Sequence, residues 1–307
     1  STVRGALSAT ATDGNIIDTG TLTITGASTF ITRDAGSNIE LNSSANAFAA
    51  AVTMKADTGG SETFGNIAFV DSEAVKLHSS AGANGDLFID GSTNGAVGGS
   101  LSITATTGNI TQSLPVTVGT TSSFTASANN ADITLSNTSN AFASAVTLST
   151  TGTTAHVVID NGTTTLDIAA STVGGDLTLT SGAAAGITDN GNVTVGGNLV
   201  ATTDANSGVI NMGTLKVDGT FALTTNGTGD ATVVNMDDTI DFANSTVRGN
   251  LTATATTGNI IDTGVLTISG TSTFTTSQSD DDITLGSVNV FTGAVALNTS
   301  GSDGDAL

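Results

Sequence analysis

The chain has 307 residues, and 6 lysines and arginines against 27 aspartates and glutamates give it a formal net charge of −21. So few basic residues exclude a nucleic-acid footprint, and the negative field repels phosphate backbones and anionic lipid. The absence of cysteine excludes disulfides, thiol nucleophiles and cysteine-based zinc sites, and no apolar run reaches the about 20 residues of a membrane-inserted helix.

Four copies of one large repeat run through the chain. Residues 1–30 and 245–274 are identical at 24 of 30 positions. Related segments begin at Gly95 and Ser171, so the copies span residues 1–94, 95–170, 171–244 and 245–307, the last being incomplete. A period of about 75 residues is typical of repeat architectures, and we expect residues 1–307 to form a single repetitive domain.

A smaller element recurs within each large copy. It consists of a β-branched residue, a short polar turn and a leucine or phenylalanine, and its average spacing of about 24 residues is the length of one solenoid coil. We therefore expect about 12 coils of roughly 21–30 residues, with three coils in each large repeat. In chain order, the markers of these coils are Val3, Ile24, Val52, Val75, Val97, Val118, Val146, Val173, Val195, Val217, Val247, Ile268 and Val295.

Short segments that alternate apolar and hydroxyl-bearing residues, such as residues 101–105 and 251–255, predict strands with one buried and one solvated face. Glycine-rich, asparagine-rich turns separate them. The predicted fold is all-β, a right-handed parallel β-helix. The expected core positions are Leu7, Leu101, Leu177 and Leu251; Phe30, Phe124 and Phe274; and Phe48, Phe142 and Phe291.

Both ends of the chain fall inside the repeat pattern. Ser1 opens a copy, and residues 297–301 match residues 148–152. Because solenoids need atypical polar caps, we expect either a segment of a longer chain or a unit whose ends are covered by neighbours.

The segment Asn140–Leu148 reads NAFASAVTL, and it occurs together with STV-x-G-x-L and LT-I-x-G-x-STF elements. This combination resembles the repeats of filamentous-haemagglutinin-like large exoproteins, which are bacterial surface adhesins of the two-partner-secretion type. The resemblance covers essentially all of residues 1–307. It implies a β-helical shaft, an extracellular or cell-surface location and an adhesive or scaffold role.

Asp18, Asp189 and Asp262 share the frame Asp-x-Gly, and Gln112 takes their place in the remaining copy. One reading is a ladder of calcium ligands. We favour local Asx turns, in which Gly20, Gly191 and Gly264 supply a positive φ, because the equivalent carboxylates lie several coils apart and cannot share one ion.

The densest acidic residues are candidates for weak calcium binding, because carboxylates crowded on a loop gain from a hard cation. A solvated, like-charged loop is the favoured alternative, since no EF-hand spacing is present. The candidates are Asp280, Asp281, Asp282, Asp303 and Asp305.

No arrangement of residues matches a catalytic site. His78 and His156 are isolated, and Arg4 and Arg248 are replaced by glycine in the other copies. The one large departure from the repeat is the insertion around residues 60–95, which carries Glu62, Asp71, Glu73, Lys76 and His78. We therefore expect no enzymatic activity and no cofactor other than calcium.

Outward threonine rows, such as Thr252 and Thr254 or Ser102 and Thr104, raise ice or carbohydrate binding as a lesser alternative. Exposed threonine is also what any solvated strand prefers, and the sequence does not predict one uniform register between neighbouring coils.

The sequence thus favours a non-catalytic extracellular shaft of an adhesin-like exoprotein, kept soluble by its acidic surface. The alternative is a filament subunit that stacks head to tail. The expected partners are further repeats or copies of the chain and a surface glycan, without nucleic acid or membrane insertion.

Overall fold

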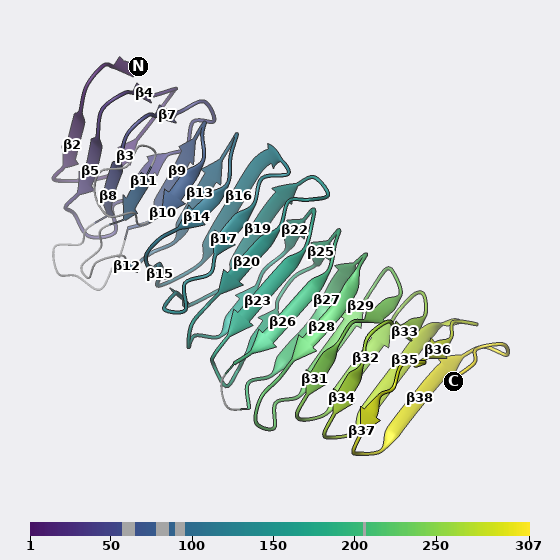
Figure 1. Cartoon of the computed structure of the whole chain (residues 1–307). Coiled ribbons are helices and arrows are strands. Elements are labelled where there is room, and N and C mark those ends of the chain that lie inside the picture. Colours follow the sequence, from purple (N-terminus) through teal and green to yellow (C-terminus); the bar gives the residue numbers. More distant parts are fainter. Residues whose placement is uncertain (57–64, 78–85, 90–95, 205–206) are drawn as a thin grey trace. The chain divides into compact units, whose positions relative to one another are not determined.

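The computed structural model describes residues 1–56, 65–77, 86–89, 96–204 and 207–307, which form strands and turns and no helix (Figure 1). None of these residues belongs to a helix that could cross a membrane. The chain divides into two compact units, Ser1–Ala155 and His156–Leu307, and each unit is a stack of parallel coils. The all-β solenoid prediction is confirmed, with a coil of about 22 residues rather than about 24.

In the first unit, two parallel sheets, sheet I and sheet II, form the principal faces. Sheet I has the spatial order β2 (Leu7–Ala11), β5 (Ser28–Thr32), β8 (Val52–Ala56), β11 (Asp86–Ile89), β10 (Val75–Leu77), β14 (Ile110–Gln112) and β17 (Ile133–Leu135). Sheet II contains β3 (Ile16–Ile17), β6 (Ile39–Leu41), β9 (Ile67–Asp71), β13 (Leu101–Ala105), β16 (Ser122–Asn129) and β19 (Val146–Thr151). Two three-stranded corner sheets contain β1 (Thr2–Val3), β4 (Thr23–Ile24) and β7 (Ala47–Phe48), and β12 (Ala96–Val97), β15 (Thr117–Val118) and β18 (Ala141–Phe142).

In the second unit, sheet III and sheet IV play the same roles. Sheet III contains β20 (Val157–Asp160), β23 (Leu177–Ser181), β26 (Leu199–Thr203), β28 (Thr220–Thr224), β30 (Ile240–Phe242), β31 (Ser245–Val247), β33 (Ile260–Asp262), β34 (Leu266–Ile268), β36 (Ile283–Thr284) and β37 (Val290–Phe291). Sheet IV contains β21 (Leu166–Ile168), β22 (Ser171–Val173), β24 (Ile187–Asp189), β25 (Val193–Val195), β27 (Ile210–Val217), β29 (Ala231–Asn235), β32 (Leu251–Ala255), β35 (Ser272–Ser279) and β38 (Val295–Ser300).

The long strand of the coil changes sheets once in each unit. In the first unit it lies on sheet I in β2, β5 and β8, and on sheet II from β9 onward. In the second unit the five-residue strands β23, β26 and β28 lie on sheet III, and the corresponding strands lie on sheet IV from β29 onward. Strand β27, on sheet IV, has eight residues because it joins two short segments, one paired with β24 and the other with β25. The coil in which the change occurs contains two consecutive long strands, β8 and β9 or β28 and β29.

This change corrects the prediction of three coils in each large repeat. In the copy 171–244, the chain alternates between the sheets as β23, β24, β26, β27, β28, β29 and β30, which is three and a half coils. A half-integral number of coils puts the next copy on the opposite sheet. Equivalent residues of successive copies therefore face opposite sides of the unit.

The core follows from the period-two alternation of each strand. Leu101, Ile103 and Ala105 are buried while Ser102 is exposed, and the same order holds along β32. Phenylalanines of neighbouring coils stack in the interior, with ring centroids 5.0 Å apart for Phe48 and Phe69 and 6.1 Å apart for Phe242 and Phe274. The predicted core positions are buried except Leu7 and Phe291, which belong to coils with a neighbour on one side only.

Among the described residues of the insertion, strand β11 is an added strand on sheet I. Strand β11 lies between β8 and β10 on sheet I, although it follows both in the chain. On sheet II, β9 pairs directly with β13. Glu62 and His78, which the sequence singled out here, lie outside the described residues.

Candidate functional site

Asparagine side chains connect successive coils at one corner of the first unit. Asn15 Oδ1 accepts the backbone N–H of Asn38 at 2.8 Å, Asn38 Oδ1 accepts that of Asn66 at 2.8 Å, and Asn66 Oδ1 accepts that of Ser100 at 2.8 Å. Each acceptor thus satisfies a turn amide that has no strand partner. We call this arrangement the corner ladder.

The second unit has the same kind of corner ladder, with aspartate at some rungs. Asp176 Oδ1 accepts the N–H of Asn198 at 2.7 Å, and Asn198 Oδ1 accepts the N–H of Thr220 at 2.9 Å. His156 stands at the first rung, where its Nδ1 accepts the N–H of Asp176 at 3.0 Å. His156 is therefore a structural acceptor in the ladder, and its Nδ1 also lies 3.2 Å from Asp176 Oδ2. Two further runs are Asp230, Asn250 and Thr271, and Asn259, Asp282 and Asp305.

The Asp-x-Gly carboxylates hold the turn of the next coil. Asp18 accepts the backbone N–H groups of Asn42 and Ser43 at 3.1 and 3.2 Å, and Asp262 Oδ1 accepts that of Gly286 at 2.7 Å. Asp189 accepts the N–H groups of Gly213 and Thr214 at 2.8 and 2.7 Å. All three carboxylates thus act as anionic caps of a turn 24 or 25 residues further along the chain.

An asparagine of that turn returns a bond to the earlier coil. Asn46 donates to Asp18 at 2.6 Å, and its Oδ1 accepts the N–H of Leu22 at 2.9 Å. Asn289 does the same between Asp262 and Leu266. In the copy where Gln112 replaces aspartate, Gln112 and Asn140 exchange two amide hydrogen bonds of 2.8 Å each. We call this reciprocal pair the turn clamp.

The turn clamp corrects two details of the predicted Asx turns. The carboxylates cap the next coil rather than their own turn, and Gly20, Gly191 and Gly264 do not have a positive φ. Close approach of the preceding coil explains the glycine instead, because a Cβ on Gly264 would lie 2.2 Å from Asn244 N and one on Gly191 2.7 Å from Ala170 N.

The five calcium candidates lie in the last two coils, and two of them accept hydrogen bonds from backbone N–H groups. Asp282 Oδ1 accepts the N–H of Asp305 at 2.9 Å, and Asp280 Oδ1 accepts that of Asp303 at 3.1 Å. Asp281 Oδ2 is a buried atom without a hydrogen bond. Within the described residues, no group of three or more acidic or histidine side chains is placed to hold a metal ion.

Hydroxyl groups form rows in register on the outer faces. On sheet II, Ser102 lies opposite Ser123 and Thr104 opposite Thr125, and β19 continues the rows with Thr147. On sheet IV, Thr252 and Thr254 lie opposite Thr273 and Thr275. On these strands the hydroxyl groups of neighbouring coils are in register, which differs from the expectation of no common register.

Among the residues that the structure describes, two carboxyl groups titrate away from their ordinary range. Burial raises the pKa of Asp71 to about 6, with a further contribution from the charge of Glu73 and opposing hydrogen bonds from backbone N–H groups. Burial also raises the pKa of Asp160, and the charge of Asp204 adds to that effect. Lys76, a positively charged residue of the same insertion as Asp71, is exposed.

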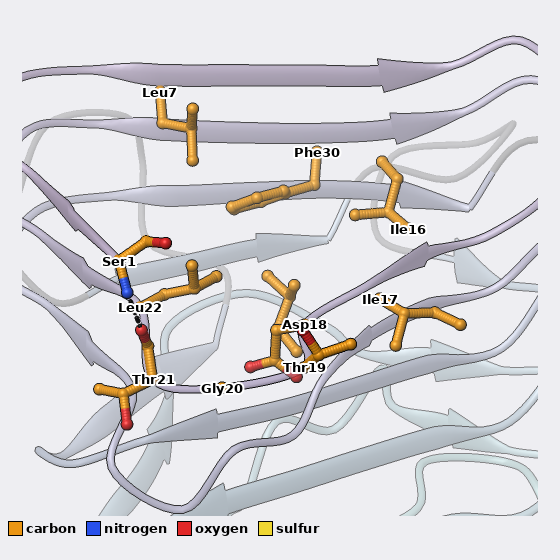
Figure 2. Close-up of a pocket in the computed structure, with 11 residues that line it drawn as sticks. Ser1, Leu7, Ile16, Ile17, Asp18, Thr19, Gly20, Thr21, Leu22 and Phe30 are labelled. Atoms are coloured by element: carbon orange, nitrogen blue, oxygen red, sulfur yellow. Dashed lines mark hydrogen bonds between the residues drawn. The ribbon is translucent and has the colours of Figure 1, made fainter.

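The first unit has a cavity of about 490 Å³ at its first coil, where inward side chains have a coil on one side only (Figure 2). Figure 2 shows Leu7, Ile16 and Phe30 around it, and the Ser1 amino group donates to Thr21 O at 2.5 Å. Asp18 is the one carboxylate in the lining. The cavity is therefore an opening of the apolar core, without the paired groups that acid–base catalysis needs.

The corner ladder was missed by reasoning from sequence, although a signal was present. Asn15, Asn38, Asn66, Asn109 and Asn259 each precede an isoleucine that starts a strand. The repeated Asn-Ile pair, at coil spacing, marks the rungs. The turn asparagines of the NAF segments, Asn46 and Asn140, carry a similar signal.

A family model described as "Repeats of unknown function (DUF5649)" matches residues 1–55, 65–149 and 228–298. No curated protein and no solved structure matches the chain.

Proposed function

The chain belongs to the family described as "Repeats of unknown function (DUF5649)", and from this premise we propose that it is a non-catalytic structural shaft of an adhesin-like bacterial exoprotein, located outside the cell or on its surface. The observation that carries the proposal is the use of its polar side chains. In the corner ladder and the turn clamp, asparagine and aspartate side chains of one coil form hydrogen bonds with the neighbouring coil.

Such a stack resists separation in a specific way. Pulling one coil from the next breaks a parallel ladder on each sheet together with the corner bonds, so many weak bonds share the load. The net charge of −21 adds a self-repelling surface, which keeps neighbouring shafts apart in solution.

Force spectroscopy on the 307-residue chain, held at its two ends, tests the mechanical part of this proposal. We expect stepwise rupture in which each released coil lengthens the chain by about 75 Å, the contour length of some 22 extended residues. An Asn38→Ala, Asn66→Ala double variant removes two rungs and should lower the rupture force of the first unit alone. Smooth extension without steps would contradict the shaft.

The location and the adhesive role need separate tests. Antibody raised against the chain should label intact cells of the source bacterium, and labelling only after lysis would contradict a surface location. The hydroxyl rows on sheets II and IV support a glycan as partner, because they present regularly spaced donors and acceptors. A glycan array should then show binding that Thr104→Val and Thr125→Val weaken.

A filament subunit is the second candidate, because contact between copies end to end would continue the parallel ladders that join successive coils. Sedimentation of the purified chain with and without calcium separates the two candidates. Uniform fibres would support end-to-end assembly, and monodisperse particles at all concentrations would oppose it.

A further inference from the structure

One buried carboxyl group is not used by the corner ladder or the turn clamp. Asp71 ends strand β9, the long strand at which the coil changes sheets in the first unit, and it is 2 % exposed. A buried carboxyl group without a cationic partner carries a large desolvation cost when it is ionised.

The second unit contains the same position with a different residue. Asp71 lies opposite Ala105 in β13, and Asn235 lies opposite Ala255 in β32. In both places the backbone oxygen of the residue accepts an N–H at 2.9 Å, from Thr106 and from Thr256 respectively. Asn235 is fully buried, so the two positions are equivalent in register and in burial.

Asparagine satisfies this position with both halves of its amide. Asn235 Oδ1 accepts the N–H of Val217 at 3.0 Å, and Nδ2 donates to the carbonyl oxygens of Val217, Asp238 and Thr239 at 3.1, 3.2 and 3.0 Å. The carboxyl of Asp71 accepts the N–H groups of Phe48 and Glu73 at 3.3 and 3.4 Å. An ionised carboxylate has no proton to donate, so it cannot make the bonds that the Asn235 amide makes.

We propose that Asp71 is a pH-sensitive joint: protonated, its carboxyl group donates a hydrogen bond in the manner of the Asn235 amide and closes the contact between β7 and the turn that follows β9; ionised, it loosens that contact. The joint sits where the long strand changes sheets, within the insertion that adds β11 to sheet I. It would give the first unit a point of adjustable stiffness that the second unit lacks.

The charges around Asp71 support this direction. Glu73 on the following turn repels the ionised form. Strands β13 and β7 contribute no ionisable side chain, Glu40 of β6 lies opposite the outward Ala68, and Lys76 of β10 is exposed. The pKa of about 6 against an ordinary 3.8 means that the folded state holds this proton more tightly. The stabilisation is therefore fully present below pH 3.8 and is lost as the pH rises through about 6.

Residue-resolved hydrogen exchange between pH 4.5 and 7.5, corrected for intrinsic rates, tests the joint. In the unmodified chain the amides of Phe48 and Thr106 should lose protection as the pH rises, by up to about 25-fold, the part of the linkage between pKa values of 3.8 and about 6 that falls within this pH window. Asp71→Asn should abolish that pH dependence. Asp13→Asn, which removes an exposed carboxylate, is the charge-matched control and should leave it in place.

The reciprocal variant keeps the test decisive if Asp71→Asn changes the fold. Asn235→Asp should bring the same pH-dependent loss of protection to the amides of Val217 and Thr256 in the second unit. Protection at Phe48 that is independent of pH in the unmodified chain, or an Asn235→Asp profile equal to that of the parent, would overturn the proposal.

Discussion

Residues 1–30 and 245–274 have nearly the same sequence and different environments. Leu251, Val247 and Ile260 are at most 1 % exposed, whereas their counterparts Leu7, Val3 and Ile16 are only half-buried. Strand β32 pairs with β29 and β35, while β2 pairs with β5 alone. The alternation within a strand thus sets which side chains point inward, and the neighbouring coil sets how completely they are buried.

Replacing Leu251 or its counterpart Leu7 by alanine should give the largest difference in stability between the two segments. Leu251→Ala leaves a cavity between two covering coils and should cost about 2–5 kcal/mol of unfolding free energy. Leu7→Ala removes a side chain that another coil covers on one side only, and it should lower the unfolding free energy by about 1 kcal/mol. Urea denaturation followed by hydrogen exchange in each unit measures both, and equal losses would contradict the role of the covering coil.

Glycine substitutions test the close approach of coils in the same pair. A Cβ on Gly264 meets Asn244 N at 2.2 Å, whereas one on Gly20 meets nothing within 4 Å. Gly264→Ala should therefore destabilise the second unit by about 1–3 kcal/mol, the usual cost of overpacking. Gly20→Ala should be close to neutral. The thermal midpoints of the two variants provide the comparison, and a neutral Gly264→Ala would show that the coils can separate at no cost.

For the turn clamp we expect equal losses of stability in the two segments, whereas for the core we expect different losses. Asp18 and Asp262 both bind the turn that follows them, and that turn is present in both places. Asp18→Ala and Asp262→Ala should each cost about 1–3 kcal/mol, because each leaves backbone N–H groups without an acceptor. A much smaller loss for Asp18→Ala, seen in the urea midpoint of the first unit, would mean that the clamp depends on the preceding coil.

One rung of the corner ladder distinguishes the two segments and has the smallest expected effect. Asn250 Oδ1 accepts the N–H and the hydroxyl of Thr271 at 2.9 and 2.8 Å, where the first copy has Ala6 and Ala27. Asn250→Ala should cost about 0.5–1.5 kcal/mol. Ala6→Asn combined with Ala27→Thr should recover a similar amount in the first unit, and no gain there would contradict the ladder as a source of stability.

Much of the fold could be predicted from the sequence, because it depends on local alternation. The period-two pattern of segments such as residues 251–255 fixes which side chains are buried, and the recurring valines mark the coils. The half-coil offset could not be predicted, because it depends on which sheet receives β9 and β29, and both sheets accept a long strand with the same pattern.

The polar sites were harder to predict for a related reason. Asp18 and Asp282 act on backbone groups 23 to 25 residues further along the chain, so their role is set by the register between coils. Local turn rules assigned Asp18 to its own turn, and Asp282 was expected to lie in a solvated acidic loop. Asp71 differs from Asn235 by one functional group, and only the shared register reveals that the two occupy the same position.

Residue-resolved hydrogen exchange of β2 and β32 in the intact chain tests most directly that the neighbouring coil sets stability. We expect the amides of Thr252 to Ala255 to exchange only on unfolding of the coils around them, and those of Ser8 to Ala11 to exchange faster by about 10-fold or more through local opening. Equal protection of the two strands would contradict this expectation.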